Sequence, residues 1–242
     1  EQFITSATRS AARFSFPFVE AGYRLHTEWL SSSMSQPSLS SSSFDEAVAA
    51  WSALDESCHV LQVGNTPACR ASIEQGLGML RTTSVAAGAD AGLEDDHSAR
   101  AALLVHLRDL MSGSHITAAG RGVRYAGDTW SPKGHLAPVF GIVGASFGLS
   151  VEATASVLGF CVARDVVSAA VRLNLIGPTT SVPLLARARR ADMEGRRAAR
   201  DRAAADGIET GAVLAMRTGI SMPVLEALHP CHEALAMRLF QT

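Results

Sequence analysis

Sulfur and imidazole side chains occur together at two places in the chain and are its first candidates for chemistry. His229, Cys231 and His232 fall within four residues, and Cys58 is followed by His59. Thiolate and imidazole groups are ligands for zinc, nickel and copper ions. Adjacent residues on a helix point about 100° apart, so Cys231 and His232 are poorly placed to hold one ion together. We therefore favour a buried cysteine and a histidine at a helix start over a metal site, and we expect no stable metal ligands.

Three charged residues in an apolar helix form a second candidate. Arg164, Asp165 and Arg172 lie among valine, alanine and leucine residues, and charged groups are rarely buried without partners. Asp165 and Arg172 are seven residues apart, about 10 Å along a helix, so they cannot pair with each other. We expect them to hold a helix junction inside the fold, close to a subunit or partner contact. The alternative is an interface that leaves the stability of the isolated chain unchanged.

Familiar catalytic and nucleotide-binding motifs are missing from the sequence. We find no G-x-x-x-x-G-K-[ST] loop, no G-x-G-x-x-G after a strand, no G-x-S-x-G and no H-E-x-x-H. The sequence therefore points away from an enzyme. A helical ligand-binding or enzyme domain remains the alternative, with a site around Arg164, Asp165, Arg172 and His135.

Composition and periodicity predict one all-α, helical-bundle-like domain of about eight to ten helices across residues 1–242. Hydrophobic residues make up 47% of the chain, and we find no sustained strand-like alternation. The formal net charge of −2 gives no reason to expect nucleic acid or an anionic membrane as a partner. Charges interrupt the most apolar run, 151–176, so we predict no membrane span. Four cysteines without a C-x-x-C pair indicate reduced thiols in the cytoplasm.

Local signals place several helices and two loops. An apolar stripe at helical spacing follows Ser43, Thr66-Pro67 starts the next helix, and Gly113 ends a later one. The Ser-rich stretch 31–43 and the Gly- and Ser-rich stretch 112–134 are predicted loops. Small residues in 137–148 indicate close helix packing inside the core, with a contact between subunits as the alternative. Seven arginines in 187–202 alternate with acids, which favours a solvated helix face over a basic patch.

Several stretches resemble the family of the urease accessory protein UreF. They are, in the family's order from about Phe14 to Thr242, FSFPFVEAGY, GNTPACRASIEQGLGML, GHLAPVFG, RDVVSAAVRLNLIGP and CHEALAMRLFQT. GHLAPVFG and VVSAAVRLNLIGP are the specific ones. RDVVSAAVRLNLIGP resembles the form of the plant and algal branch, and CHEALAMRLFQT resembles the carboxyl end of that branch. The family's amino-terminal Pro-Thr-Gly-Gly-Phe segment is missing, so we expect that segment to be needed for full urease activation.

The resemblance implies an all-α protein without enzymatic activity of its own. Such proteins dimerise and bridge a UreD/UreH-like scaffold to a UreG-like GTPase, and the assembly delivers nickel to apo-urease. On this resemblance we expect no stably bound cofactor, nickel handled by the assembly, and GTP used only through a partner. The candidate partner-contact residues are Asn65, Arg70, Ser72, Gln75, Gly76, His135, Phe140, Gly141, Gly144, Arg164, Asp165, Ser168, Arg172 and Asn174.

Overall fold

Helices account for nearly all of the regular structure. The computed structural model describes residues 1–34, 41–90, 95–116, 132–205 and 223–234, and these contain no strand. The prediction of an all-α fold is therefore confirmed. The helices are α1 (Gln2–Met34), α2 (Ser41–Gln62), α3 (Thr66–Asp90), α4 (Asp95–Ile116), α5 (Leu136–Ser146), α6 (Val151–Arg172), α7 (Pro178–Ala205), α9 (Pro223–Leu228) and the 3₁₀ helix η2 (His229–Ala234).

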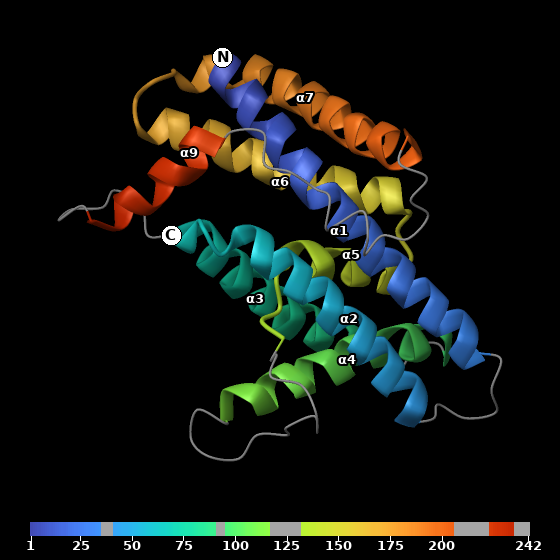
Figure 1. The fold of residues 1–242 in the computed structure, drawn as a ribbon. Coiled ribbons are helices and arrows are strands. Elements are labelled where there is room, and N and C mark those ends of the chain that lie inside the picture. Colours follow the sequence, from blue (N-terminus) through green and yellow to red (C-terminus); the bar gives the residue numbers. More distant parts are fainter. Residues whose placement is uncertain (35–40, 91–94, 117–131, 206–222, 235–242) are drawn as a thin grey trace.

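The short helix α5 lies at the centre of the arrangement. It packs most extensively against α1 and also contacts α3, α4 and α6. Figure 1 shows α6 and α7 beside the first part of α1, with α2, α3 and α4 gathered on the other side of the molecule. Nine of the eleven residues of α5 are buried, which agrees with its high content of apolar residues. A helix buried on nearly every side fixes the position of the residues just before it.

Glycines let α1 and α5 cross with their backbones in contact. A β-carbon on Gly22 would lie 2.2 Å from the Pro138 carbonyl oxygen, and one on Gly141 would lie 2.1 Å from the Val19 carbonyl oxygen. A β-carbon on Gly144 would overlap Thr154 of α6 at 2.1 Å. At Gly141 and Gly144, the small residues of this stretch therefore serve packing within the core, as favoured from the sequence.

Helices reach further into the two predicted loops than the sequence indicated. The last residues of α1 include Ser31 and Ser32, whose hydroxyl groups donate to the carbonyls of Thr27 and Glu28. Serine side chains that bond back to the preceding turn remain compatible with a helix, although serine is a modest helix former. At the other loop, α4 continues past Gly113 to Ile116. The middle of each stretch, 35–40 and 117–131, lies outside the described residues, and α2 begins at Ser41, inside the first stretch.

The arginine-rich stretch forms most of α7, and its charges are largely paired. Arg9 of α1 bonds Glu194 at 2.6 Å, and Arg200 bonds Glu152 of α6 at 2.6 Å. The pair of Arg196 and Asp192, at 2.8 Å, is almost buried. The first two contacts join α7 to α1 and α6, and the third lies within α7, so much of the charge serves this fold.

Helix α6 is long and apolar enough to cross a membrane by length and composition alone. About 39% of its apolar window is buried inside the protein, and α6 packs against α1, α5 and α7. One such helix is weak evidence for a membrane protein, because a core helix of a soluble protein has the same composition.

Candidate functional site

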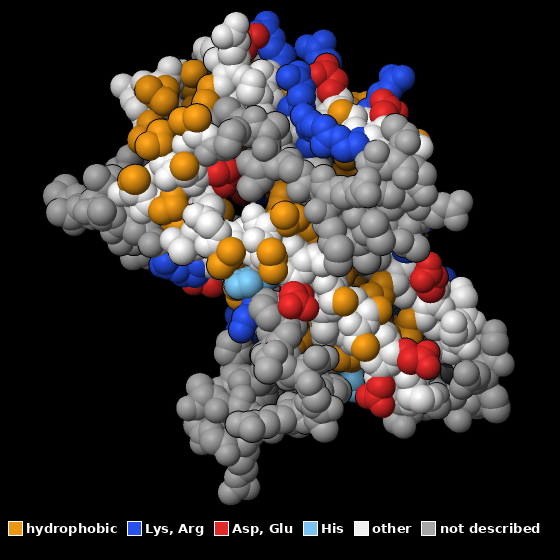
Figure 2. Space-filling view, in the orientation of Figure 1, with side chains coloured by type: hydrophobic (Ala, Val, Ile, Leu, Met, Phe, Trp, Pro, Cys, Tyr) orange, Lys and Arg blue, Asp and Glu red, His pale blue; other side chains and the backbone are white. Residues whose placement is uncertain are grey.

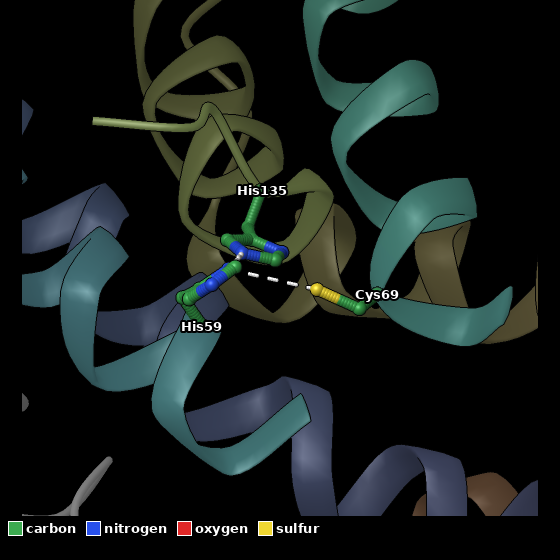
Figure 3. Close-up of side chains that lie close together, drawn as sticks. All are labelled: His59, Cys69 and His135. Carbon is green, nitrogen blue, oxygen red and sulfur yellow. Dashed lines mark hydrogen bonds between the residues drawn. The ribbon is translucent and has the colours of Figure 1, made fainter. Parts of the chain in front are cut away.

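Three metal-ligating side chains from three different elements meet beside the start of α5. Figure 3 shows His59 near the end of α2, Cys69 near the start of α3, and His135 just before α5. His59 Nδ1 lies 3.1 Å from His135 Nε2 and 3.5 Å from Cys69 Sγ. One potential ligand atom of each residue lies within 4.8 Å of the other two. We call these three residues the His-Cys-His cluster.

A helix–turn–helix connection places two members of the cluster. The chain leaves α2 after Gln62 and re-enters a helix at Thr66, so the end of α2 lies next to the start of α3. Asn65 stabilises this turn by accepting the Ala68 N–H at 3.2 Å. Pro67 occupies the first turn of α3, where its missing N–H has no consequence. The ten-residue separation of His59 and Cys69 therefore becomes a short distance in space.

A buried carboxylate fixes the third member. Asp55, fully buried on α2, accepts the backbone N–H groups of Lys133 at 2.6 Å and His135 at 2.7 Å. The N–H of Gly134, between them, lies 3.2 Å from both carboxylate oxygens. Gly134 adopts a positive φ of 80°, a conformation that favours glycine. Asp55 thus holds three consecutive residues of the segment that presents His135.

The imidazole of His135 is buried and held from its other side by Ser72. Ser72 Oγ accepts the Leu136 N–H at 3.2 Å and lies 3.1 Å from His135 Nδ1. Gln62 Nε2 lies farther from the same Nδ1, at 3.5 Å. If Nδ1 carries the proton and donates to the nearer hydroxyl oxygen, Nε2 keeps a free lone pair directed at His59. Gly76 makes room for the segment, because a β-carbon there would lie 2.1 Å from the Gly134 carbonyl oxygen.

Burial shifts the pKa values of two members of the cluster, His135 and Cys69. It lowers the pKa of His135 to about 4; Asp55 opposes this shift, while His59 and Lys133 add to it. Burial also raises the pKa of the Cys69 thiol, and the charge of Asp55 acts in the same direction. At neutral pH His135 is therefore a neutral imidazole, the form in which histidine binds metal ions.

The charged candidates on α6 lie at the surface, so the expectation of an internal junction is wrong. Arg164 and Asp165 have side chains that are 57% and 62% exposed, and Arg172 is exposed as well. Arg164 donates from Nε and Nη2 to Asp165 Oδ1 at 3.0 and 2.8 Å. The long side chain of Arg164 can reach its neighbour Asp165 in solvent. Because one face of α6 is open, these two charges need no buried partner.

The structure also fails to assemble the alternative ligand or enzyme site. Both ring nitrogens of His135 face side chains of α2 and α3. Arg164 and Asp165 pair with each other on the exposed side of α6. The four residues of that alternative therefore do not form one site.

The remaining candidate contact residues divide by exposure. Asn65, Gly76, His135, Phe140, Gly141 and Gly144 are buried, and Ser72 and Ser168 are half-buried. Asn65 donates to Glu226 of α9, so at least part of its role is internal. The exposed candidates, which remain predictions as partner contacts, are Arg70, Gln75, Arg164, Asp165, Arg172 and Asn174.

Sequence reasoning considered Cys58 and Cys231 but missed the His-Cys-His cluster. Cys58 is buried and bonded by Gln62 Nε2 at 3.0 Å. Cys231 is exposed on η2, so the interpretation of it as a buried cysteine is wrong. All four cysteines are free thiols. The signal that could have been found is the spacing of His59 and Cys69 across a predicted helix break at Thr66-Pro67. His135 is 66 residues beyond Cys69, and no local pattern connects them.

Comparison with known proteins assigns the family. The UreF family model matches residues 1–189, most of the chain. The chain therefore belongs to the UreF family of urease accessory proteins. Two relatives, each named urease accessory protein F, from Oryza sativa subsp. indica and subsp. japonica, are 28% identical to it over 194 residues. The match covers 80% of this chain and 60% of each relative, so the chain spans about three fifths of their length. No solved structure matches the chain.

Proposed function

We propose that this chain acts in urease assembly as a non-catalytic adaptor. In this role it binds a UreD/UreH-like scaffold and a UreG-like GTPase, and the resulting complex delivers nickel to apo-urease. GTP is bound and hydrolysed by the partner alone. Membership of the UreF family over residues 1–189 is the observation that carries the proposal.

The surface offers apolar area for such partners. Leu173, Leu175 and Val182 are exposed around the turn between α6 and α7, and Leu175 is 73% exposed. Figure 2 shows hydrophobic side chains gathered over this part of the molecule. Contiguous exposed apolar groups are typical of protein–protein contact sites. We call Leu173, Leu175 and Val182 the α6–α7 apolar surface, and propose that it contributes to contacts within a complex containing two copies of this chain.

A copurification experiment tests the assignment. The tagged chain is co-expressed in the cytoplasm of a host cell with UreD-like, UreG-like and apo-urease subunits. The complex is then isolated through the tag and analysed by mass spectrometry. We expect the scaffold and the GTPase to copurify, and we expect the pure chain alone to hydrolyse no GTP. GTP hydrolysis by the pure chain, or failure of both partners to copurify, would reject the proposal.

A further inference from the structure

We propose that His59, Cys69 and His135 form a binding site for one divalent transition-metal ion of the zinc class. The ligand atoms are His59 Nδ1, Cys69 Sγ and His135 Nε2. This inference rests on the geometry of the His-Cys-His cluster and is independent of the urease assignment.

Two of the three separations between the donor atoms match those around a tetrahedral ion, and the third is at most 4.8 Å. Zinc binds nitrogen at about 2.05 Å and sulfur at about 2.3 Å, which places two nitrogens about 3.3 Å apart and nitrogen and sulfur about 3.6 Å apart. The corresponding separations from His59 Nδ1 are 3.1 Å to His135 Nε2 and 3.5 Å to Cys69 Sγ. An ion would therefore fit with shifts of a few tenths of an ångström in these two separations.

The surroundings orient one donor before an ion arrives. Ser72 can accept the Nδ1 proton of His135, as a residue behind a metal-bound histidine commonly does, and this leaves Nε2 as the ligand. Asp55 fixes the backbone of His135 and places a buried negative charge nearby. Both contacts favour a cation at the cluster.

The ion would replace a proton between the two rings. In the metal-free chain a hydrogen on His59 Nδ1 can bridge to His135 Nε2 across their 3.1 Å separation. When a metal binds, that proton moves to His59 Nε2 or leaves, and the Cys69 thiol loses its proton to become a thiolate ligand. Three protein donors leave a fourth position for water or for an incoming donor. His59 is only half-buried, whereas Cys69 and His135 are buried, so we infer that the open position lies on the His59 side.

Metal loading of matched variants tests the site. The full chain is stripped with a chelator, loaded with Zn²⁺ or Co²⁺, passed through gel filtration and analysed for metal content. We expect one ion per chain in the wild type, with a thiolate-to-cobalt charge-transfer band for Co²⁺. Cys69→Ser and His59→Gln should lose the ion and the band. The matched controls, Cys231→Ser and His229→Gln, should keep both.

Two further measurements separate metal binding from folding. Circular dichroism of the metal-free variants establishes that they are folded, and Zn²⁺ should raise the melting temperature of the wild type but not of Cys69→Ser. Ser72→Ala should retain the ion with an affinity lowered by about 10- to 100-fold, as expected for loss of a residue that orients a ligand.

Several outcomes would overturn the proposal. One is a wild-type chain that holds no stoichiometric Zn²⁺ or Co²⁺ after gel filtration. Another is full metal content in both Cys69→Ser and His59→Gln. A third is loss of the ion in Cys231→Ser and His229→Gln with retention in the cluster variants, which would place the ion at the other end of the chain.

Discussion

Asp55 accepts the backbone N–H groups of three consecutive residues beside the His-Cys-His cluster, and its removal should be costly. Asp55→Ala leaves the N–H groups of residues 133–135 without their carboxylate partner in a buried place. We expect the free energy of unfolding to fall by about 3 to 5 kcal/mol, because each buried unpaired group costs about 1 to 3 kcal/mol. Glu56→Ala, on the exposed side of the same helix, is the control and should change it by less than about 0.5 kcal/mol. Chemical denaturation measures both values.

Protonation of His26 should lower the stability of the folded chain in acid. It is fully buried in α1, and its Nε2–H donates to the Arg100 carbonyl at 2.9 Å. Burial lowers the pKa of His26 below the ordinary 6.5; the bond to Arg100 opposes this shift and the charge of Arg100 adds to it. The unfolded chain therefore takes up a proton at higher pH than the folded chain. The stability that neutral His26 contributes to the folded chain is complete above pH 6.5. It is lost as the pH falls from 6.5 through the lowered pKa of the folded chain.

The test compares unfolding of the wild type and His26→Gln from about pH 7.5 to 5 in the presence of a chelator. Glutamine keeps an N–H donor for the Arg100 carbonyl but does not titrate in this range. We expect the variant to lose less stability than the wild type as the pH falls. Identical pH profiles would show that His26 is protonated equally in the folded and unfolded chains.

At the scale of residues, the sequence poorly predicted which side chains meet to form a site, and the reasons are physical. The contacts of Asp55 with residues 133–135 and of His59 with His135 connect segments that are more than 70 residues apart. No periodicity records such contacts. Arg164 and Asp165 were misplaced because the apolar content of α6 suggested a helix buried on every side. One face of α6 is open, and the two charges pair there.

At the scale of elements, replacing glycine by alanine should have opposite effects on stability at two helical positions. Gly141→Ala would push a methyl group into the backbone of α1, which cannot yield as a flexible side chain would. We expect a loss of about 3 kcal/mol, at the upper end of the usual range for overpacking. Gly78→Ala in α3 meets no atom within 4 Å and should gain up to about 1 kcal/mol from improved helix propensity. Thermal melting of the two variants measures both effects, and equal shifts would contradict the crossing geometry.

The elements themselves were largely predictable, since helix formation depends on local patterns. The apolar stripe predicted after Ser43 is buried at Val48, Trp51, Leu54 and Cys58, and its first residue, Phe44, is half-buried. Thr66-Pro67 begins α3, and Gly148, with a φ of 70°, lies between α5 and α6. Helix ends were less predictable where serine or glycine entered a helix, as in the last turns of α1 and α4. There, hydrogen bonds to the preceding turn and the neighbouring helices decide the boundary.

At the scale of the whole molecule, substitutions in the α6–α7 apolar surface should weaken partner binding without changing the stability of the chain. Combined Leu175→Asp and Val182→Asp should leave the free energy of unfolding within about 0.5 kcal/mol of the wild type per substitution, because both side chains are largely exposed. Partner affinity should fall at least about thirtyfold, the effect of losing a contact worth about 2 kcal/mol. Val85→Asp, an exposed valine on α3, is the control. Isothermal titration with the purified partners measures affinity, and unchanged binding would place the contact elsewhere.

The central position of α5 has a consequence for how the chain is made. Helix α1 is completed at Met34, but the first of its two main packing partners, α5, begins at Leu136, roughly 100 residues later, and the second, α7, follows at Pro178. At about 5 to 20 residues per second, a ribosome needs about 5 to 20 seconds to synthesise that interval. Throughout this time the nascent α1 exposes Phe16, Phe18 and Val19, which are buried in the finished protein. We therefore expect ribosome-associated chaperones to bind the emerging α1, and to be released only after α5 has left the exit tunnel.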